Sequence, residues 1–390
     1  MAAASPVRDD GQPALADSLV ALDDNGALPA DVLYEILLRV PAKPLCRLRL
    51  VCRSWRSLTS DPRFAGAHSS RHPMIAGLCA HGIQGEIQIV DLRSGNIDKR
   101  IYGFGLELRD LDFTTQGDLI CASSVIMKGW KRDCIIDPTM GSTTILPTSG
   151  MDAYFSVCIL GHVPSTWEYK VLRVGAFIPS TNRRPCQIIT LIGGAQRWRA
   201  RSDPSLPVSI HRHTPVVAGV VYFLLDRFSV RDFPNAKNDD IVAFDLATEE
   251  WRSATIQGPF STCLVNANGE IAHSPTMDYL ELAKLNNFLV TIHHNEQDHS
   301  MDIWFLVDMD KSHWTKRYAI PCLPRWNCHM CTPLVILNDG RIVLHFEGIR
   351  VLQAYDPRID TCARLTMPED YFAVSLYEGS LLLRSVFMGT

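Results

Sequence analysis

The sequence predicts an α+β protein in two parts, a small N-terminal helical module followed by a larger all-β domain. Over residues 28–64 the apolar residues recur at helical spacing. From about residue 73 onward the period changes to two, and short apolar runs alternate with Gly, Asp, Asn and Pro turns. Hydrophobic residues make up 46% of the 390 residues and charged residues 21%, so most of the chain can fold around a core.

Residues 1–27 are predicted to form a disordered acidic tail. They hold five aspartates against one arginine and offer little apolar surface to bury. The first residues, MAAASPVRDD, lack the basic flank and apolar run of a secretion signal, and no apolar stretch of about 18 residues follows. We therefore expect no membrane partner and a cytoplasmic or nuclear location, where the twelve cysteines stay reduced.

Residues 28–64 predict two or three short helices. Pro29 suits the first helical turn, where its missing N–H is not needed, and Asp31 lies near the positive end of the helix. Pro41 ends the first helix, and Asp61-Pro62 ends the whole run. The apolar residues at helical spacing are Val32, Leu33, Ile36, Leu37 and Val40, then Leu45, Leu48, Val51, Cys52, Trp55 and Leu58.

The β region repeats one phrase, an apolar run followed by an Asp, a few turn residues and a Trp or aliphatic residue. The Asp side chain can accept a hydrogen bond from the backbone two residues on, which fixes a turn between two strands. In one repeat Ile192-Gly193-Gly194 stands in place of the Asp, and Trp198 follows. The other five anchors are Asp91, Asp137, Asp245, Asp308 and Asp356.

A repeat of roughly 50 residues has the size of a four-stranded propeller blade. The anchors therefore predict a propeller-like domain of about six blades. We expect tail strands at 371–376 and 380–387 to pair with the first strands after His72, because this pairing closes the ring and removes its edges. Residues 278–285 are the one segment whose pattern also suits a short helix.

The helical segment resembles an F-box over its whole length, LPADVLYEILLRVPAKPLCRLRLVCRSWRSLTSDPRF. Many family positions occur here in order, which is far more specific than one short motif. The matching positions are Leu28-Pro29, Leu33, Ile36, Leu37, Val40-Pro41, Lys43, Leu45, Val51-Cys52-Arg53, Trp55 and Asp61-Pro62-Arg63-Phe64. On this resemblance we expect an F-box module at 28–68.

The remainder, residues 73–390, resembles the plant F-box-associated domain. The phrases that match are EYKVLR at 168–173, GVVYFL at 219–224, IVAFDL at 241–246 followed by Trp251-Arg252, residues 280–285, MDIW at 301–304 and WTK at 314–316. The resemblance implies that the helices bind a Skp-family adaptor and, through it, a cullin-RING ubiquitin ligase. It also implies that the β domain captures a client protein for ubiquitination.

The apolar side chains of the helical module indicate a partner independently of the resemblance. A segment of about 40 residues seldom makes a sufficient core by itself, yet each large apolar side chain contributes roughly 1.5–3 kcal/mol when buried. The surface left over must pack on the β domain or dock in a groove of a second protein. Trp55 suits either a contact or an internal position. The predicted adaptor contacts are Leu28, Pro29, Val32, Leu33, Ile36, Leu37, Val40, Pro41, Leu45, Val51, Cys52 and Trp55.

A basic DNA-binding module is one alternative, because residues 28–64 hold seven Lys/Arg against three acidic residues. Against it, the turn Pro41-Ala42-Lys43-Pro44 lacks the glycine of a helix-turn-helix, and the arginines are spread around the helices. The net charge of −4 also disfavours a nucleic-acid partner. A second alternative is an F-box protein that acts outside the ligase as a protein-interaction scaffold.

An enzyme or metal site has little support in the sequence. The densest cluster is His293, His294, Glu296 and His299, and Cys328 with Cys331 frames a lone CxxC around His329. Zinc needs about four convergent ligands, and neighbouring residues of a strand point to opposite faces. Neither a GxSxG elbow nor a phosphate-binding P-loop occurs. We therefore expect no catalytic residue, no metal and no cofactor.

The client is expected to contact loops of the β domain, since propellers present their loops on their rims. The longest predicted non-strand stretches are 199–214, 226–240 and 320–331. Arg and aromatic side chains are the usual energetic anchors of interfaces. On this basis the predicted client contacts are Arg231, Phe233 and Trp326.

Overall fold

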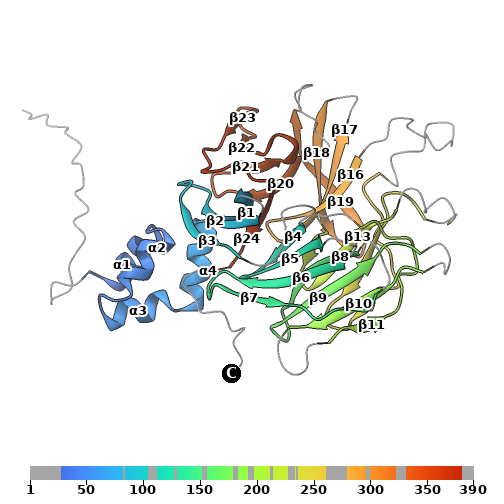
Figure 1. Ribbon diagram of the computed structural model, residues 1–390. Coiled ribbons are helices and arrows are strands. Elements are labelled where there is room, and N and C mark those ends of the chain that lie inside the picture. Colours follow the sequence, from blue (N-terminus) through green and yellow to red (C-terminus); the bar gives the residue numbers. More distant parts are fainter. Residues whose placement is uncertain are drawn as a thin grey trace, which may run out of the picture.

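A computed structural model shows a group of short helices beside a ring of β-sheets (Figure 1). It describes residues 28–81, 84–103, 112–126, 130–151, 156–178, 183–191, 197–210, 214–226, 233, 236–260, 279–295, 299–321 and 331–379. The predicted acidic tail at 1–27 lies outside these residues.

Four helices form the N-terminal module, α1 (Ala30–Leu38), α2 (Ala42–Leu48), α3 (Arg53–Thr59) and α4 (Pro62–Arg71). Pro29 and Pro41 occupy the positions just before α1 and α2. The expectation that Asp61-Pro62 ends the helical run was wrong, because this pair begins α4. The Asp61 carboxylate accepts a hydrogen bond from the Arg63 N–H at 2.7 Å, and Pro62 takes the first helical position, where no N–H is required.

Six four-stranded antiparallel sheets follow as six propeller blades, which confirms the predicted fold. Blade 1 consists of β24, β1, β2 and β3, and blades 2 to 6 take the remaining strands in sequence order. The bounds in blades 1 to 3 are β24 (Ala373–Tyr377), β1 (Met74–His81), β2 (Gln84–Asp91) and β3 (Ile97–Ile101); β4 (Asp112–Gln116), β5 (Leu119–Ile126), β6 (Trp130–Asp137) and β7 (Ser142–Ile145); β8 (Ser156–Val163), β9 (Glu168–Gly175), β10 (Cys186–Thr190) and β11 (Arg199–Arg201).

Blades 4 to 6 have the same order of strands. Their bounds are β12 (Val216–Val217), β13 (Val220–Leu224), β14 (Ile241–Asp245) and β15 (Glu250–Trp251); β16 (Tyr279–Leu285), β17 (Phe288–Asn295), β18 (Ser300–Asp308) and β19 (His313–Pro321); β20 (Cys331–Ile336), β21 (Ile342–Phe346), β22 (Val351–Asp356) and β23 (Thr361–Arg364), with a 3-10 turn at Glu347–Ile349. Residues 279–285 form strand β16 rather than a helix, because pairing with β17 along the whole segment decides its conformation.

The aspartate anchors make the turns that the sequence predicts. Asp91, Asp137, Asp245 and Asp356 each accept a hydrogen bond from the backbone N–H two residues on, at 2.8–3.0 Å. Asp308 accepts one from the Lys311 N–H at 3.1 Å. Each turn joins the third and fourth strands of its blade. Ile192-Gly193-Gly194 lies outside the described residues, between β10 and β11 of blade 3.

The C-terminal strand closes the ring. Strand β24 pairs with β1 from Ala373 opposite Leu78 to Tyr377 opposite Met74, so the last described strand completes the first blade. This confirms the expected pairing of 371–376, while 380–387 lies outside the described residues. The Tyr371 ring packs directly over Gly77, and its hydroxyl donates to Gln88 Oε1 at 2.8 Å. A Cβ at Gly77 would lie 2.5 Å from that ring, so the close packing requires glycine there.

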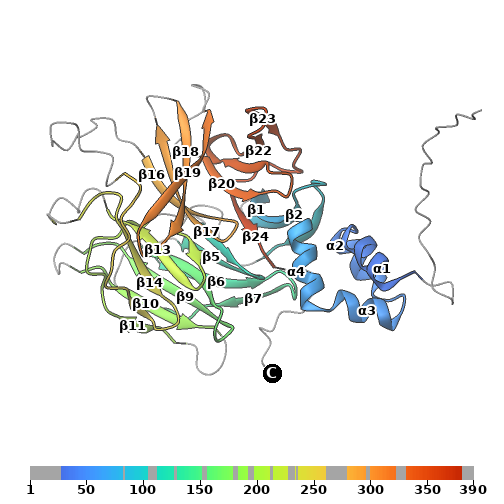
Figure 2. The same ribbon diagram turned by 180° about the vertical axis from the view of Figure 1, so that it is seen from behind.

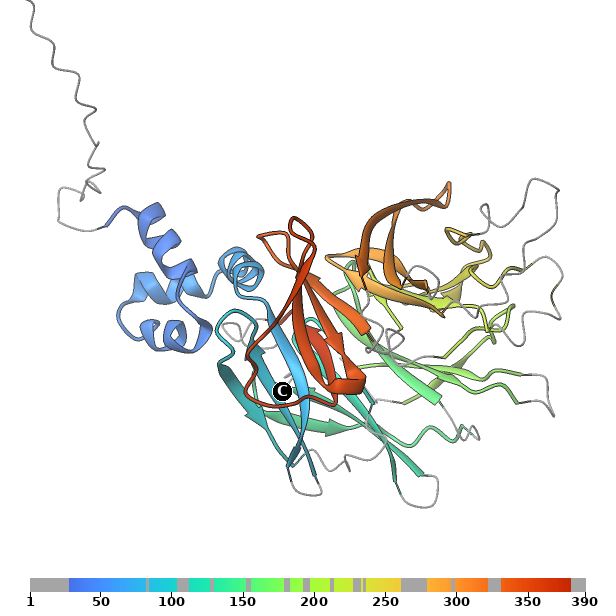
Figure 3. The ribbon, with the colours of Figure 1, turned by 90° about the horizontal axis from the view of Figure 1, so that it is seen from above.

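The inner strands of the antiparallel blades all end on one face, and α4 leads into the first strand, β1, at this face. The helices stand beside the ring (Figure 3). At this face the Asn286 amide exchanges two hydrogen bonds of 2.9 Å with the backbone of Ile336, and Lys284 pairs with Glu378 at 2.6 Å. The Asn338 amide, in the turn after β20, lies 3.4 Å from the Ser70 carbonyl of α4. We call this side the helix face and the opposite side the far face.

Candidate functional site

The helical module has a small core of its own. Leu37, Leu45 and Phe64 are buried at its centre with exposures of 1% or less. Leu33, Val40 and Trp55, all predicted adaptor contacts, pack half-buried around that centre. The side chains of Leu37 and Leu45 therefore stabilise the module itself and present no surface to a partner.

Apolar side chains also stand on the outside of the module. Ile36 on α1 is 44% exposed, and Leu28 just before α1 is 40% exposed. In the turn between α2 and α3, Leu50 is 78% and Val51 is 62% exposed. We call these four side chains the apolar ridge. The rear view shows α1, α2 and α3 standing away from the blades, with only α4 alongside them (Figure 2).

The most exposed member of the apolar ridge, Leu50, is absent from the predicted contacts. Helical spacing runs through Leu45, Leu48, Val51 and Cys52 and omits Leu50. The structure ends α2 at Leu48, so Leu50 lies in the turn, where helical spacing no longer describes which side a residue faces. Among the other predicted contacts, Cys52 is exposed, while Pro29, Val32 and Pro41 are half-buried.

A row of stacked rings joins the module to blade 1. Phe64 and His68 stack on α4, and His68 stacks on His72 with 4.5 Å between ring centres. His68 Nε2 lies 2.8 Å from the Val40 carbonyl, and His72 Nε2 lies 3.0 Å from the Leu38 carbonyl, so both imidazoles can donate to the end of α1. The other nitrogen of His72, Nδ1, lies 3.4 Å from the Asp91 carboxylate of blade 1.

Asp91 therefore has two structural roles. It fixes the turn between β2 and β3 and it faces His72. Burial by itself raises the pKa of Asp91, but the interaction with His72 and the N–H groups of Ser94 and Arg93 outweigh it and lower the pKa to about 2. The carboxylate at this junction is consequently charged over the whole physiological pH range.

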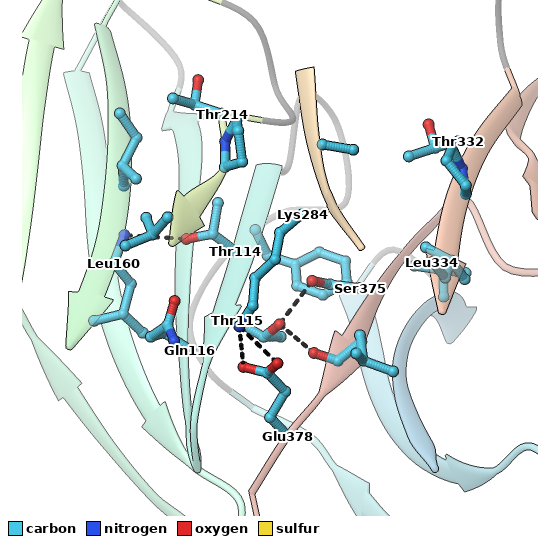
Figure 4. Close-up of a pocket in the computed structure, with 18 residues that line it drawn as sticks. Thr114, Thr115, Gln116, Leu160, Thr214, Lys284, Thr332, Leu334, Ser375 and Glu378 are labelled. Carbon is cyan, nitrogen blue, oxygen red and sulfur yellow. Dashed lines mark hydrogen bonds and ion pairs between the residues drawn. The ribbon is translucent and has the colours of Figure 1, made fainter. Parts of the chain in front are cut away.

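A hollow runs along the propeller axis, lined by the inner strand of every blade (Figure 4). Its volume is about 130 Å3. The Lys284 ammonium and the Glu378 carboxylate meet across it at 2.6 Å, and Thr115 Oγ1 lies 2.7 Å from Ser375 Oγ. The rest of the lining is mainly aliphatic, with further threonine hydroxyls. The Thr115–Ser375 hydrogen bond joins the inner strands of blades 2 and 1, and the Lys284–Glu378 ion pair links blade 5 to blade 1, so the polar groups of the hollow hold the ring together at its centre.

The structure describes only one of the three predicted client contacts. Phe233 is 38% exposed, and its carbonyl accepts a hydrogen bond from the Ala236 N–H at 3.0 Å. Arg231 and Trp326 lie outside the described residues. Stretch 226–240 follows the end of β13 at Leu224 and precedes β14 at Ile241, and stretch 320–331 joins the end of β19 at Pro321 to the start of β20 at Cys331, all on the far face. Stretch 199–214 is not wholly without strand, because Arg199 and Arg201 lie on β11 and contact Glu249.

The histidine cluster is divided between two sides of blade 5. His293 faces Phe260 at 4.6 Å and lies 4.0 Å from Asp302, whereas the neighbouring His294 is 1% exposed. Within the described ranges, no group of three or more His, Cys, Asp or Glu side chains could hold a metal ion. Glu296, Cys328 and His329 lie outside those ranges.

Comparison with known proteins identifies both parts of the chain. The family model described as the F-box associated beta propeller domain matches residues 114–352, more than half of the chain. The chain belongs to this family. The F-box domain model matches residues 27–65, which cover the apolar ridge and helices α1 to α3. Domains of these two families are typically non-catalytic adaptor and receptor domains.

The chain is similar to F-box proteins of a plant. F-box protein At5g65850 of Arabidopsis thaliana is 23% identical over 83% of this chain and 76% of its own length. F-box protein At3g07870 of Arabidopsis thaliana is 25% identical over 85% of this chain and 86% of its own length. Among solved structures, a chain of a nidogen/laminin complex covers 79% of this chain and 96% of its own, with 11% identity and a TM-score of 0.42.

Of the helices that the structure describes, none is long and apolar enough to cross a bilayer. The longest, α4, has ten residues.

Proposed function

We propose that this chain is the substrate-recognition subunit of a Skp–cullin–F-box ubiquitin ligase. The F-box module docks a Skp-family adaptor, and the propeller captures a client protein for ubiquitination. The observation that carries the proposal is the apolar ridge, which remains exposed although the module already has a closed core and the propeller lies behind it. The match of the F-box domain model to the same residues supports it.

The energetics favour a second protein over water as the neighbour of the apolar ridge. Each large apolar side chain contributes roughly 1.5–3 kcal/mol when it is fully buried, so the four side chains together can supply much of the free energy of docking. Side chains of this kind on short helices suit an apolar groove. We propose that the contact surface consists of Leu28, Pro29, Val32, Leu33, Ile36, Val40, Pro41, Leu50, Val51, Cys52 and Trp55.

The test is adaptor capture by a variant in which Ile36→Ala is combined with Val51→Ala. Both side chains are exposed, so their removal leaves the buried cluster around Leu37 and Leu45 intact. We expect copurification of a Skp-family adaptor to fall at least about tenfold while the melting temperature is unchanged, because about 2 kcal/mol of apolar contact is lost.

A matched control removes the same kind of side chain from the propeller. Ile349→Ala combined with Ile359→Ala deletes two isoleucines that are 51% and 67% exposed. This control should capture the adaptor at the wild-type yield. Equal adaptor capture by the Ile36/Val51 variant and the wild type would contradict the proposed surface.

We assign the client to the far face of the propeller, within residues 73–390, and leave the helix face to the ligase. The helices are anchored at the helix face by Ser70 and His72, whereas the predicted client stretches leave strand ends of the far face. Affinity purification of the Ile36/Val51 variant beside the wild type, followed by mass spectrometry, tests this division. We expect adaptor and cullin to disappear from the variant while the client remains.

A further inference from the structure

The outermost strand of blade 5 differs from those of the other blades. Strand β19 has nine residues, whereas the outer strands of the other five blades have between two and five. Among the described strands β19 pairs only with β18, so its outer edge presents backbone N–H and C=O groups without a strand partner. The strands of this blade stand at the top of the view in Figure 1. A long free edge is the kind of surface to which an extended segment of another chain can add.

The pairing of β18 with β19 places one arginine in an unusual position. Ile303 lies opposite Tyr318 and the next residue, Trp304, lies opposite Lys316, so Arg317 is the extra residue of a β-bulge. Bulges redirect a side chain out of the regular alternation of a strand. The Arg317 guanidinium lies 4.5 Å from the ring centre of Phe305 and 5.4 Å from that of Phe288.

The charge of Arg317 has no acidic partner among the described residues, although the neighbouring lysine does. Lys316 pairs with the buried carboxylate of Asp302 at 2.6 Å. The Arg317 guanidinium stacks on two aromatic rings, and the residue is exposed. Strand β19 contains no Asp or Glu, and Phe288 is itself 43% exposed. An exposed arginine fixed against aromatic rings is a preorganised site for a carboxylate, with an apolar surface beside it.

We propose that the outer edge of β19 is a docking strand for an extended segment of a partner protein that carries an acidic residue facing Arg317. The backbone of the segment would continue the β-ladder of blade 5, and its carboxylate would accept hydrogen bonds from the guanidinium. The Cβ atoms of residues directly across an antiparallel pair lie about 5 Å apart, so a glutamate opposite Arg317 can extend toward the N–H groups at the rim of the stacked guanidinium. This inference deepens the proposed role of the propeller as a receptor, on which it rests.

The other function open to the same features is protection of the edge. Lysine, arginine and bulges on an edge strand also prevent pairing between copies of a chain. That explanation requires only positive charge at the edge, and it predicts no preference for an acidic residue at one position of an added strand. The two explanations therefore differ in a measurable way.

The experiment uses the full chain and a labelled peptide as long as β19. The peptide alternates threonine and valine, has lysines at its ends for solubility, and carries one glutamate at its centre. Fluorescence anisotropy gives its dissociation constant, and hydrogen exchange reports which backbone amides it protects. We expect saturable binding with new protection in β19, and binding about tenfold weaker when glutamine replaces the glutamate or when Arg317→Gln is introduced.

Two controls distinguish binding through the ion pair and the backbone hydrogen bonds from nonspecific peptide binding. Arg350→Gln removes another exposed arginine stacked on a ring, 3.7 Å from the centre of Phe372, but outside any edge strand, and should leave the dissociation constant unchanged. A peptide with prolines on both sides of the glutamate lacks the backbone N–H groups that would donate hydrogen bonds to β19, and it should not bind.

The proposal is overturned if the glutamate and glutamine peptides bind equally, if protection appears in another strand, or if no peptide binds. Adaptor capture is measured on the same Arg317→Gln protein and should equal the wild type. If the peptide does not bind but adaptor capture is normal, only the docking strand is contradicted. If the Ile36/Val51 variant captures the adaptor as well as the wild type does, only the proposed adaptor surface is contradicted.

Discussion

At the scale of single residues, Glu249 is the main electrostatic link between two blades. It lies in the turn that joins β14 and β15 of blade 4, and its carboxylate contacts Lys170, Arg199 and Arg201 of blade 3. Its side chain is 12% exposed. Burial by itself raises the pKa of Glu249, but the hydrogen bonds from Arg201, Lys170 and Arg199 outweigh it and lower the pKa to about 2.

This depressed pKa predicts how stability depends on pH. A carboxylate whose pKa is lower in the folded than in the unfolded chain stabilises the fold above its unfolded pKa, and this stabilisation is lost as the pH falls toward the folded value. Glu249→Gln should therefore lower the free energy of unfolding by about 3 kcal/mol at pH 7, because three cations lose their partner. The difference between variant and wild type should shrink between about pH 5 and pH 2.

Urea unfolding at several pH values measures both effects. Glu250→Gln is the matched control, since Glu250 is the next residue and is exposed. The control should change the free energy of unfolding by less than about 0.5 kcal/mol. A Glu249 variant as stable as this control at pH 7 would contradict the role assigned to the ion-pair cluster.

The contrast between Asp245 and Glu249 shows what a sequence reveals at this scale. The Asp245 carboxylate accepts a hydrogen bond from the backbone N–H of Ala247. Because this partner is only two residues away, the interaction can be predicted from the residue type and the turn in which it lies. Glu249 lies four residues further, but Lys170 is far away in sequence and reaches it only because two blades pack side by side. Leu50 was missed for a local reason, because the end of α2 decides which way it faces.

At the scale of elements, one tryptophan contact recurs between successive blades. Trp251 on β15 donates its Nε1–H to the Ser202 carbonyl of the preceding blade at 2.9 Å. Trp198 donates in the same way to Pro147 at 2.7 Å, and Trp314 donates to Gln257 at 2.8 Å. Each acceptor lies beyond the end of the outer strand of the previous blade, so the indole joins two blades whose outer strands share no ladder.

Trp251→Phe should test the polar part of this contact. The ring centres of Phe223 and Phe244 lie 5.4 and 5.1 Å from that of Trp251. Phenylalanine retains an aromatic ring against both, but it cannot donate the hydrogen bond. We expect the free energy of unfolding to fall by about 1–2 kcal/mol, from the lost hydrogen bond and the smaller ring. Thermal or urea unfolding provides the measurement.

Trp167→Phe is the control for that prediction, because Trp167 is 76% exposed. It should leave stability nearly unchanged. If the Trp251 and Trp167 variants unfold at the same urea concentration, the indole hydrogen bond has no role in joining the blades.

At the element scale, the features of the chain that are local and repeated were predictable from the sequence. The aspartate turns and the switch of apolar period predicted six blades, and the tryptophans were visible as part of the repeated phrase. The prediction was wrong at Asp61-Pro62, a pair that suits both the end of one helix and the start of another. The sequence also left β16 undecided, because a short apolar run becomes a strand only when a partner such as β17 lies beside it.

At the scale of the whole molecule, the ring depends on a contact between its two ends. Strand β24 supplies the inner strand of blade 1, and Tyr371, Val374 and Tyr377 are all at most 3% exposed. Each buried side chain of this size contributes roughly 1.5–3 kcal/mol, so the closing segment contributes about 5 kcal/mol or more, comparable with the whole stability of many domains. The pairing of 371–376 with β1 was predictable because an open ring leaves two strand edges free.

Truncation after Met367 should therefore unfold or loosen the propeller while the helical module stays competent. The shortened chain loses β24 and the Tyr371 packing on Gly77, which leaves the edge of β1 free to aggregate. Because α1 to α4 and their core precede the propeller and bury Leu37, Leu45 and Phe64 among themselves, adaptor capture should persist.

Truncation after Gly379 is the matched control and should melt like the wild type, since β24 ends at Tyr377. Calorimetry and adaptor pull-down on both chains measure the two parts separately. If the chain ending at Met367 melts within about 2 °C of the control, closure by β24 is unnecessary for stability. If the chain ending at Met367 loses adaptor capture, the helical module depends on the propeller.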